Sequence, residues 1–342
     1  MMKALVKSRP GPGLWLEHVP IPAIGPNDVL IKVLKTGICG TDLHVFNWDP
    51  WARRHIEPPR IIGHEFVGEI VELGSEVKGY AAGARVTAEG HITCGICHNC
   101  RAGRRHLCAH AVGIGGGRDG AFAEYLAMPA FNLWPVPADI PSELAAIFDP
   151  FGNAVHCALS FPVAGEDVLI TGAGPIGIMA AAVCRFIGAR HVVISDVNDQ
   201  RLQLAARMGA SRIVNVASNS IAEVMDDLQL PDGFDIGLEM SGNADAFNDL
   251  LRSMSNGAHV ALLGFLPTST EINWDDVILK GLFLKGIYGR EMFETWYRMT
   301  RLVTSGLDVA PVITHRFAAD DFQQAFEAVR SGTGVKAVLD WE

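Results

Sequence analysis

A glycine-rich turn directly after an apolar strand is the feature that most constrains the fold. Val168-Leu169-Ile170 precedes Gly172-x-Gly174-x2-Gly177, and the residues that follow have helical periodicity. The first glycine permits a tight turn, the second lets the backbone approach a pyrophosphate, and the third lets helix and strand pack closely. Pro175 suits the first turn of a helix, where no backbone donor is lost. The segment therefore predicts a strand, a phosphate-binding turn and a helix whose N-terminus faces the phosphate charge.

Strands and helices alternate from about residue 167 onward. The first helices are expected at Ile176–Ile187 and Gln200–Met208. Six apolar runs with helical segments between the first few favour a doubly wound parallel sheet, a Rossmann domain, at residues 151–290. The six expected strands are Val168–Thr171, His191–Ser195, Arg212–Val216, Phe234–Met240, His259–Gly264 and Leu282–Tyr288.

Asp196 ends the second expected strand, 19 residues after Gly177 (196 − 177 = 19). A carboxylate at this place accepts hydrogen bonds from both adenosine ribose hydroxyls and repels a 2′-phosphate, so it favours NAD over NADP. Arg201 lies close by in the sequence and could instead bind such a phosphate. We interpret Arg201 as a group that packs against the adenine or pairs with Asp196, and we predict NAD.

The first 150 residues consist of short apolar runs bounded by Gly and Pro, such as Val29–Val33. Long helical periodicity is scarce there, which predicts a β-rich domain. After a helical segment near Met292–Thr304 the chain returns to short strands. The expected organisation is a β-rich domain formed by residues 1–150 and 291–342, with the Rossmann domain inserted into it.

Four cysteines lie close together in the arrangement Cys94-x2-Cys97-x2-Cys100-x7-Cys108. The 342-residue chain has only seven cysteines, which does not fit a secreted disulfide framework. Thiolates at this spacing can converge on one tetrahedral Zn²⁺ and leave it no open coordination position. A structural zinc site is therefore predicted in a lobe at residues 90–110.

A second metal site is predicted upstream of this lobe. Cys39 and the pair His64-Glu65 offer a thiolate, an imidazole and a carboxylate, a mixed zinc ligand set with room for a substrate. Taken singly, these residues could be a buried thiol, a core histidine and an exposed acid. Their combination with the cysteine lobe indicates a catalytic zinc site in addition to the structural one.

The charge of the chain argues against some partners. Lys and Arg number 28 and Asp and Glu number 38, for a net charge of −10 and a pI near 5.6. Such a surface repels phosphate backbones, so the cysteine lobe is not expected to bind nucleic acid. The sequence has neither a signal-peptide core nor an apolar run of membrane-spanning length, and clustered thiols suit a reducing compartment. We expect a cytoplasmic protein with no membrane partner.

These motifs together resemble the zinc-dependent medium-chain alcohol dehydrogenases over the whole chain. The run Gly63-His64-Glu65-x2-Gly68-x5-Gly74-x2-Val77 matches the signature of that superfamily. More narrowly, the chain is similar to the family of bacterial L-threonine 3-dehydrogenases. The stretches behind this narrower similarity are ICGTDLHVFNWDPW (38–51), GHITCGICHNCRAGRRHLC (90–108), AAIFDPFGNAVHCAL (145–159), GLEMSG (237–242) and KGLFLKGIYGREMFETWY (280–297).

The resemblance implies a β-rich GroES-like catalytic domain joined to a Rossmann domain, with NAD and two Zn²⁺ ions per subunit as cofactors. It also implies a homotetramer that oxidises the side-chain hydroxyl of L-threonine to 2-amino-3-oxobutanoate. Because that amino-ketone is unstable, functional coupling to a 2-amino-3-ketobutyrate CoA ligase is plausible.

Carried over by position, the resemblance gives roles to individual residues. Thr41 and His44 match a proton-relay pair, and Asp149 matches an acid that either approaches the catalytic zinc or supports the relay. The matching metal ligands are Cys39, His64 and Glu65 for the catalytic zinc and Cys94, Cys97, Cys100 and Cys108 for the structural zinc. The residues expected to bind the cofactor are Gly172, Gly174, Ile176, Gly177, Asp196, Arg201, Leu263, Gly264, Phe265, Ile287 and Tyr288.

Some residues near these motifs have no assigned role. Cys157 departs from the family, in which a threonine is expected at this position; as a buried thiol it would act as a small apolar group. His91, Trp48 and Trp51 are candidates for the wall of the substrate pocket, although each could equally serve in packing.

Two other functions remain open. A polyol or 2,3-butanediol dehydrogenase of the same superfamily would use the same zinc and NAD chemistry, but it gives no reason for the segments 149–153 and 289–291. A catalytically silent NAD-binding protein would not need the complete mixed ligand set.

Overall fold

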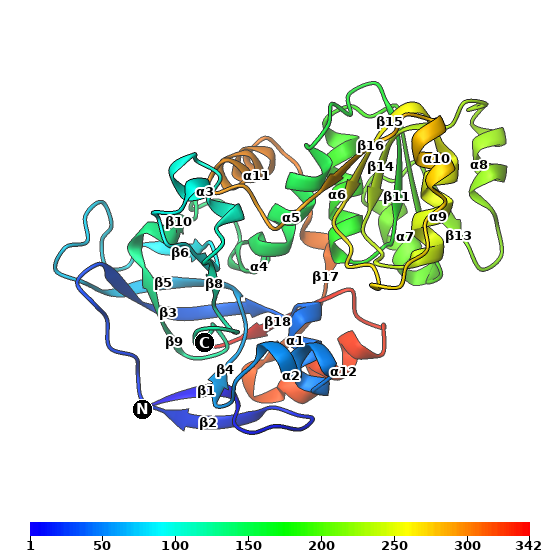
Figure 1. Ribbon diagram of the computed structural model, residues 1–342. Coiled ribbons are helices and arrows are strands. Elements are labelled where there is room, and N and C mark those ends of the chain that lie inside the picture. The colour runs from blue at the N-terminus through cyan, green and yellow to red at the C-terminus, as the bar shows by residue number, and fades with distance from the viewer. The chain divides into compact units, whose positions relative to one another are not determined.

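The computed structural model describes all 342 residues and divides into two compact units, shown in Figure 1. Unit 1 contains Met1–Pro150 and Ile313–Glu342, and unit 2 contains Phe151–Val312. None of the helices combines the length and the apolar character needed to cross a lipid bilayer.

The second boundary between the units lies after Val312, whereas the sequence suggested residue 290. Helix α11 (Glu294–Thr304) explains this difference. Its buried Met299 has its sulfur 3.4 Å from the position that a Cβ on Gly152 would occupy, so α11 packs against the beginning of unit 2.

Unit 1 is β-rich, as the sequence predicts. Its main strands are β1 (Met2–Lys7), β2 (Trp15–Val19), β3 (Asp28–Gly37), β4 (Arg60–Ile61), β5 (Glu65–Leu73), β6 (Arg85–Ala88), β9 (Tyr125–Pro129), β10 (Leu133–Pro135), β17 (Ile313–Ala318) and β18 (Lys336–Asp340). A seven-stranded sheet has the order β10-β6-β5-β3-β18-β17, with β9 also paired to β3, and a smaller sheet has the order β2-β1-β4. The helices of this unit are α1 (Gly40–Asn47), α2 (Pro50–His55), α3 (His98–Arg101), α4 (Ser142–Ala146) and α12 (Phe322–Arg330), while α5 (Phe148–Ala158) crosses the first boundary.

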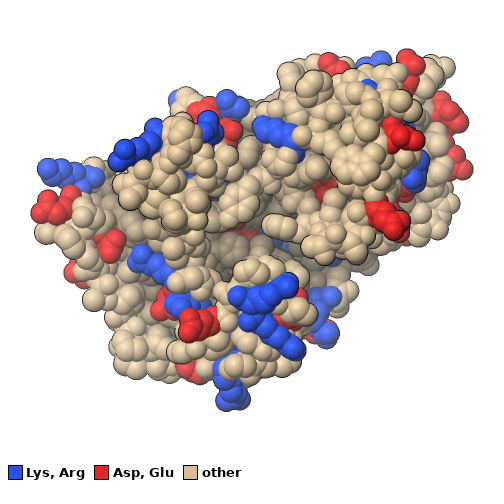
Figure 2. Space-filling model, viewed as in Figure 1, with Lys and Arg blue, Asp and Glu red and all other residues tan.

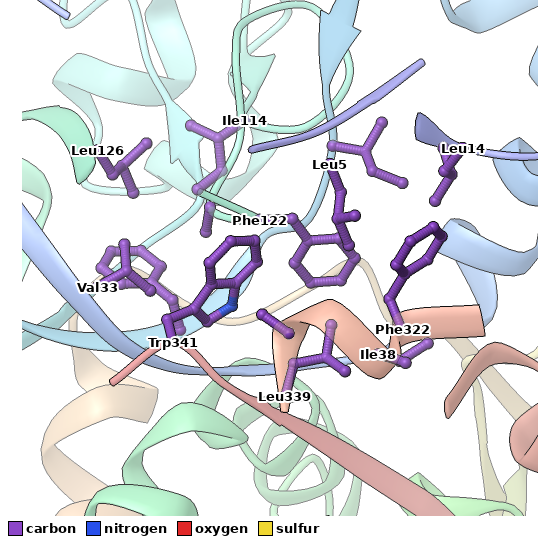
Figure 3. Close-up of a cluster of buried hydrophobic side chains, with 14 of the residues drawn as sticks. Leu5, Leu14, Val33, Ile38, Ile114, Phe122, Leu126, Phe322, Leu339 and Trp341 are labelled. Carbon is purple, nitrogen blue, oxygen red and sulfur yellow. The ribbon is translucent and has the colours of Figure 1, made fainter. Parts of the chain in front are cut away.

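The core of unit 1 joins the two ends of the chain. Leu5 and Phe122 belong to the same buried cluster as Leu339 and Trp341 (Figure 3). The indole Nε1 of Trp341 donates a hydrogen bond to the Thr36 hydroxyl at 2.9 Å, and β18 pairs antiparallel with β3. The C-terminal residues thus belong to unit 1 together with the first 150 residues.

Unit 2 has the predicted doubly wound parallel sheet. Its strands are β11 (Asp167–Thr171), β12 (His191–Asp196), β13 (Arg212–Asn215), β14 (Phe234–Glu239), β15 (Met254–Leu262) and β16 (Phe283–Gly286). They pair in parallel in the order β13-β12-β11-β14-β15-β16, which is the Rossmann order with its reversal point between β11 and β14. The helices are α6 (Pro175–Phe186), α7 (Asp199–Arg207), α8 (Ile221–Asp227), α9 (Ala244–Ser253), α10 (Trp274–Leu279) and α11.

The expected strands agree with the observed ones to within two residues at each end, except at the start of β15. β15 begins at Met254, earlier than the expected His259, because α9 ends at Ser253 and passes into the strand without a separate turn.

On the face in Figure 2, each unit carries Lys and Arg in small groups with Asp and Glu between them. That face therefore offers no continuous basic surface to a nucleic acid.

Candidate metal centres and dinucleotide site

The four clustered cysteines point their sulfur atoms toward one another. The Sγ–Sγ distances are 3.5 Å for Cys94–Cys108, 3.9 Å for Cys97–Cys108 and 4.0 Å for Cys94–Cys100. Four sulfurs placed tetrahedrally at 2.3 Å from one zinc ion would lie about 3.8 Å apart. The lobe thus has the geometry of a closed zinc site, as its spacing predicts.

Backbone hydrogen bonds and burial change the pKa values of the thiols in the lobe. The lobe is formed by β7 (His91–Ile92), β8 (Val112–Gly113) and α3. The backbone N–H of Cys100 lowers the pKa of the Cys97 thiol to about 6. Burial raises the pKa of the Cys100 thiol to about 11. The four thiols therefore differ in how readily they ionise, although all can contribute a sulfur ligand.

Cys39, His64 and Glu65 form the second cluster. Each offers a ligand atom, and these atoms lie within 4.8 Å of one another. Glu65 is fully buried; its Oε1 has no hydrogen-bond partner, and its Oε2 is ion-paired with the Lys336 ammonium. A buried carboxylate with one unpartnered oxygen beside a thiol and an imidazole fits a zinc ion, because the ion would satisfy that oxygen and bind the other two donors.

Local backbone geometry brings these ligands together. Cys39 is the N-cap residue of α1, and Glu65 begins β5 directly after His64. Gly63 has φ +88°, which favours glycine, and a Cβ there would lie 2.2 Å from the Phe122 ring. The glycine before His64 is therefore required for the turn that aims the histidine and the glutamate.

Asp42 supports this cluster, although no role was predicted for it from the sequence. Its Oδ2 accepts a hydrogen bond from the Cys39 backbone N–H at 2.8 Å, and its Oδ1 lies 3.9 Å from His64 Nδ1. Burial alone would lower the pKa of His64, but Cys39, Asp42 and Asp149 outweigh it and raise that pKa well above its ordinary value. The surroundings are thus strongly negative, as a cation site requires.

Asp149 lies beside the second cluster. It is buried, and its charge acts on both His64 and Glu65. A Cβ on Gly90 would lie 3.9 Å from both Asp149 Oδ2 and His64 Cβ, so Gly90 lies between the two residues. Asp149 is not among the three donors that lie within 4.8 Å of one another.

Thr41 and His44 are both on α1. The Thr41 hydroxyl lies 3.8 Å from the Cys39 sulfur, and His44 Nδ1 lies 2.5 Å from Asp49 Oδ2. Asp49 also accepts hydrogen bonds from the first backbone N–H groups of α2, which fixes its position. The His44 side chain is 54% exposed, so α1 reaches from the cluster to solvent.

The three residues suggested for the substrate wall have other contacts. Trp48 is buried in the core, where the Lys7 ammonium lies 4.7 Å from its ring centre. Trp51 stacks on His55 with 4.6 Å between ring centres, and His91 Nδ1 lies 2.8 Å from Glu89 Oε1. The buried position of Trp48 is therefore explained by packing in the core of unit 1.

The glycine-rich turn in unit 2 has the predicted geometry. Gly172 has φ +95°, and a Cβ on Gly177 would lie 2.0 Å from the Gly172 carbonyl oxygen. Gly174 is the N-cap residue of α6, and Pro175 is in its first turn. The helix N-terminus is thus free to face a phosphate group.

The remaining expected cofactor residues lie near the carboxyl ends of neighbouring strands. Asp196 Oδ2 accepts a hydrogen bond from the Ala173 N–H at 2.7 Å, which ties it to the glycine turn. Arg201 forms no ion pair with Asp196, and its Nε is buried without a hydrogen bond. The other residues are Ile176 on α6, Leu263, Gly264 and Phe265 directly after β15, and Ile287 and Tyr288 directly after β16. The sheet therefore gathers all of them at one edge, where Rossmann domains bind dinucleotides.

Glu239 is a buried acid at this edge that the sequence analysis did not identify. Its Oε1 accepts hydrogen bonds from the Ser241 N–H, the Ser241 hydroxyl and the Gly242 N–H, at 2.9, 2.6 and 2.9 Å. Glu239 thus fixes the turn at Ser241 and Gly242. A Cβ on Gly172 would lie 2.8 Å from Ser241 Cα, so this turn packs directly against the glycine-rich turn.

Cys157 is fully buried, and burial raises its pKa well above the usual value, which fits a small apolar group.

Comparison with known proteins agrees with both halves of this structure. Residues 25–138 match the model of the alcohol dehydrogenase GroES-like domain, and residues 175–305 match that of the zinc-binding dehydrogenases. The chain belongs to the zinc-binding alcohol dehydrogenase family.

One relative of known name and two solved structures show how similar the chain is to individual dehydrogenases. The L-threonine 3-dehydrogenase of Aeromonas hydrophila is 60% identical over 341 residues, with 100% of both chains covered. The crystal structure of a zinc-binding dehydrogenase from Sinorhizobium meliloti 1021, bound to NADP, has a TM-score of 0.92 and 31% identity, with 99% of both chains covered. The structure of 2R,3R-butanediol dehydrogenase from Bacillus subtilis has a TM-score of 0.90 and 25% identity, with 100% of both chains covered.

Proposed function

We propose that the protein oxidises the side-chain hydroxyl of L-threonine to 2-amino-3-oxobutanoate with NAD as hydride acceptor. The observation that carries this proposal is the convergence of Cys39, His64 and Glu65 in a chain that is 60% identical, end to end, to an L-threonine 3-dehydrogenase. A catalytically silent NAD-binding protein would not need this ligand set.

The residues of unit 1 would hold the metal and move the proton. When bound, zinc supplies Lewis acidity that favours loss of the substrate hydroxyl proton, and NAD supplies the hydride acceptor. Thr41 has a hydroxyl that can accept and donate a proton beside Cys39, and the exposed His44 can pass it to solvent. Asp49 holds the His44 ring through Nδ1, which leaves Nε2 for the transfer.

NAD, rather than NADP, is proposed as the cofactor because a carboxylate ends β12. Asp196 would accept the ribose hydroxyls and repel a 2′-phosphate. Kinetics of Asp196→Ser with both cofactors test this assignment. We expect the preference for NAD to weaken, and an unchanged preference would remove Asp196 from the site.

Threonine is preferred over a polyol or butanediol because the two segments that those rivals leave unexplained, 149–153 and 289–291, contact each other. Arg290 Nη1 donates a hydrogen bond to Asn153 Oδ1 at 3.1 Å, and His156 Nδ1 lies 2.8 Å from the Gly289 carbonyl oxygen. The two segments thus form one structural unit, and both lie in the stretches that resemble the L-threonine 3-dehydrogenases.

One assay separates the candidate functions. NADH formation is measured with L-threonine, sorbitol and 2,3-butanediol, each with and without a chelator. We expect chelator-sensitive NADH formation with L-threonine at the highest kcat/KM. Higher kcat/KM on sorbitol or butanediol would support the rival dehydrogenases, and no activity on any substrate would support the silent protein.

We further propose a cytoplasmic homotetramer that is functionally coupled to a 2-amino-3-ketobutyrate CoA ligase. Clustered free thiols suit a reducing compartment. Exposed apolar side chains on the edge strand β16 and on α10 support subunit contacts there, since Phe283, Ile278 and Leu279 are 62%, 69% and 80% exposed. Light scattering of the purified protein tests the tetramer.

A further inference from the structure

Lys336 lies against Glu65, although it is not one of the predicted site residues. Its Nζ forms an ion pair with Glu65 Oε2 and donates a hydrogen bond to the Ile38 carbonyl oxygen at 2.7 Å. The side chains are 2% and 0% exposed, so both charges are buried. Burying an ion pair is costly, and it is weak evidence for a gain in stability. Its place in the second metal cluster points instead to a functional role.

The contact is built into the sheet of unit 1. Gly37, at the end of β3, is paired with Val338 of β18 on one side and with Glu65 of β5 on the other. A Cβ on Gly37 would lie 2.1 Å from Glu65 Oε2 and 3.2 Å from Lys336 Cε. Any other residue at position 37 would thus separate the lysine from the glutamate.

Glu65 therefore faces two cation positions with one carboxylate. One of its carboxylate oxygens belongs to the cluster with Cys39 and His64, and its Oε2 contacts the Lys336 ammonium. An ammonium and a zinc ion in the same buried site repel each other strongly and compete for the same anion. A zinc ion that takes Glu65 as a ligand must share the negative charge of the carboxylate with Lys336.

We propose that Lys336 is a positioning residue that keeps Glu65 a weak, exchangeable zinc ligand. Without the ammonium, the buried carboxylate would have the zinc ion as its only counter-charge and would hold it more tightly. The proposal rests on Cys39, His64 and Glu65 as zinc ligands, but not on the identity of the substrate.

Zinc release to a chromogenic chelator tests the proposal without any substrate. Cys39→Ser identifies the release phase that belongs to this centre, and the cysteine lobe provides an internal control. Lys336→Gln removes the charge but keeps a hydrogen-bond donor, and we expect it to slow the Cys39-dependent phase about tenfold. Lys336→Arg keeps the charge and should release zinc no more slowly than the wild type.

Three outcomes would overturn the proposal. The first is release from Lys336→Gln at the wild-type rate or faster. The second is release from Lys336→Arg that is as slow as expected for the glutamine variant, which also decides the question if Lys336→Gln does not fold. The third is slowing by Lys336→Gln in a Glu65→Gln background, since the lysine would then act without the carboxylate. If the wild type binds zinc only in the lobe, the ligand assignment fails as well; if it lacks threonine activity, only the substrate assignment fails.

Discussion

The two metal centres of unit 1 differ in how they are built. The lobe takes four cysteine sulfurs from one short segment, and three of their separations are 3.5, 3.9 and 4.0 Å. The second centre takes three different ligands from two segments, and Asp42, Asp149 and Lys336 surround it. The ligands of the first centre contact one another, whereas two ligands of the second centre also lie beside other charged side chains: Glu65 beside Lys336 and His64 beside Asp42.

This difference has a physical consequence for metal affinity. In the lobe, the sulfurs contact backbone N–H groups and one another, and no ammonium group is among these partners to compete with a zinc ion. In the second centre, the Lys336 ammonium competes for Glu65, and Asp42 lies close to His64. We therefore expect the lobe to retain its zinc when the second centre has already lost its own.

Cys39→Ser should produce the largest effect on catalysis. Loss of the thiolate removes the softest ligand of the second centre, and we expect activity to fall by about 10³-fold or more. Metal analysis of the purified variant should find about one zinc per chain. Two tightly bound zinc ions together with full activity would contradict the ligand assignment.

Cys100→Ser should affect the stability of the fold more than catalysis, the reverse of Cys39→Ser. We expect loss of the lobe zinc, a fall in Tm of about 5 °C or more, and a smaller loss of activity than in Cys39→Ser. Thermal unfolding and metal analysis measure both changes. An unchanged Tm with one zinc missing would show that the lobe does not contribute to the stability of the fold.

His44→Gln should lower turnover by about tenfold and change the pH dependence of kcat, because a group that can transfer a proton is removed. The zinc content should not change, since His44 is not among the clustered ligands. Asp49→Asn, which removes the charge beside His44 Nδ1 and keeps an oxygen that can cap α2, is a matched control that should shift the same limb of the profile by less. A pH profile identical to that of the wild type in both variants would mean that the proton leaves by another route.

Zinc binding by the lobe should depend on pH through its thiols. A pKa of about 6 for Cys97, caused by the Cys100 backbone N–H, makes it largely a thiolate at neutral pH. A pKa of about 11 for Cys100, caused by burial, keeps it a thiol, so zinc binding must release its proton. Between these values the contribution of Cys100 raises zinc affinity as pH rises.

A pH indicator measures this release when zinc is added to the metal-free Cys39→Ser variant at pH 7.5. We expect at least one proton per zinc ion. Release of none would mean that Cys100 is already ionised or does not bind the metal.

The comparison of the two centres also shows what the sequence could predict. The cysteine lobe and the glycine turn are short segments whose spacing determines their geometry, and both could be identified directly. Asp42 was missed although it has a local signal, since it is the third residue after Cys39 at the start of a helix. Lys336 has no such signal, because its contact depends on the register of β18, β3 and β5.

The fold of unit 2 was more predictable than its boundary. Alternating apolar runs and the turn at Gly172 indicated the Rossmann sheet, but the helical pattern of α11 does not reveal which unit its apolar face contacts. That assignment depends on the packing of Met299 near Gly152, which only the three-dimensional structure shows.

The most direct test is a single time course in which the enzyme is exposed to a chelator while released zinc and remaining activity are followed in the same sample. We predict that activity falls to near zero as the first of two zinc ions per chain leaves, and that added zinc restores it while the lobe still holds the other ion. Full activity after the first zinc ion has left would contradict the claim that the Cys39, His64 and Glu65 centre performs the catalysis.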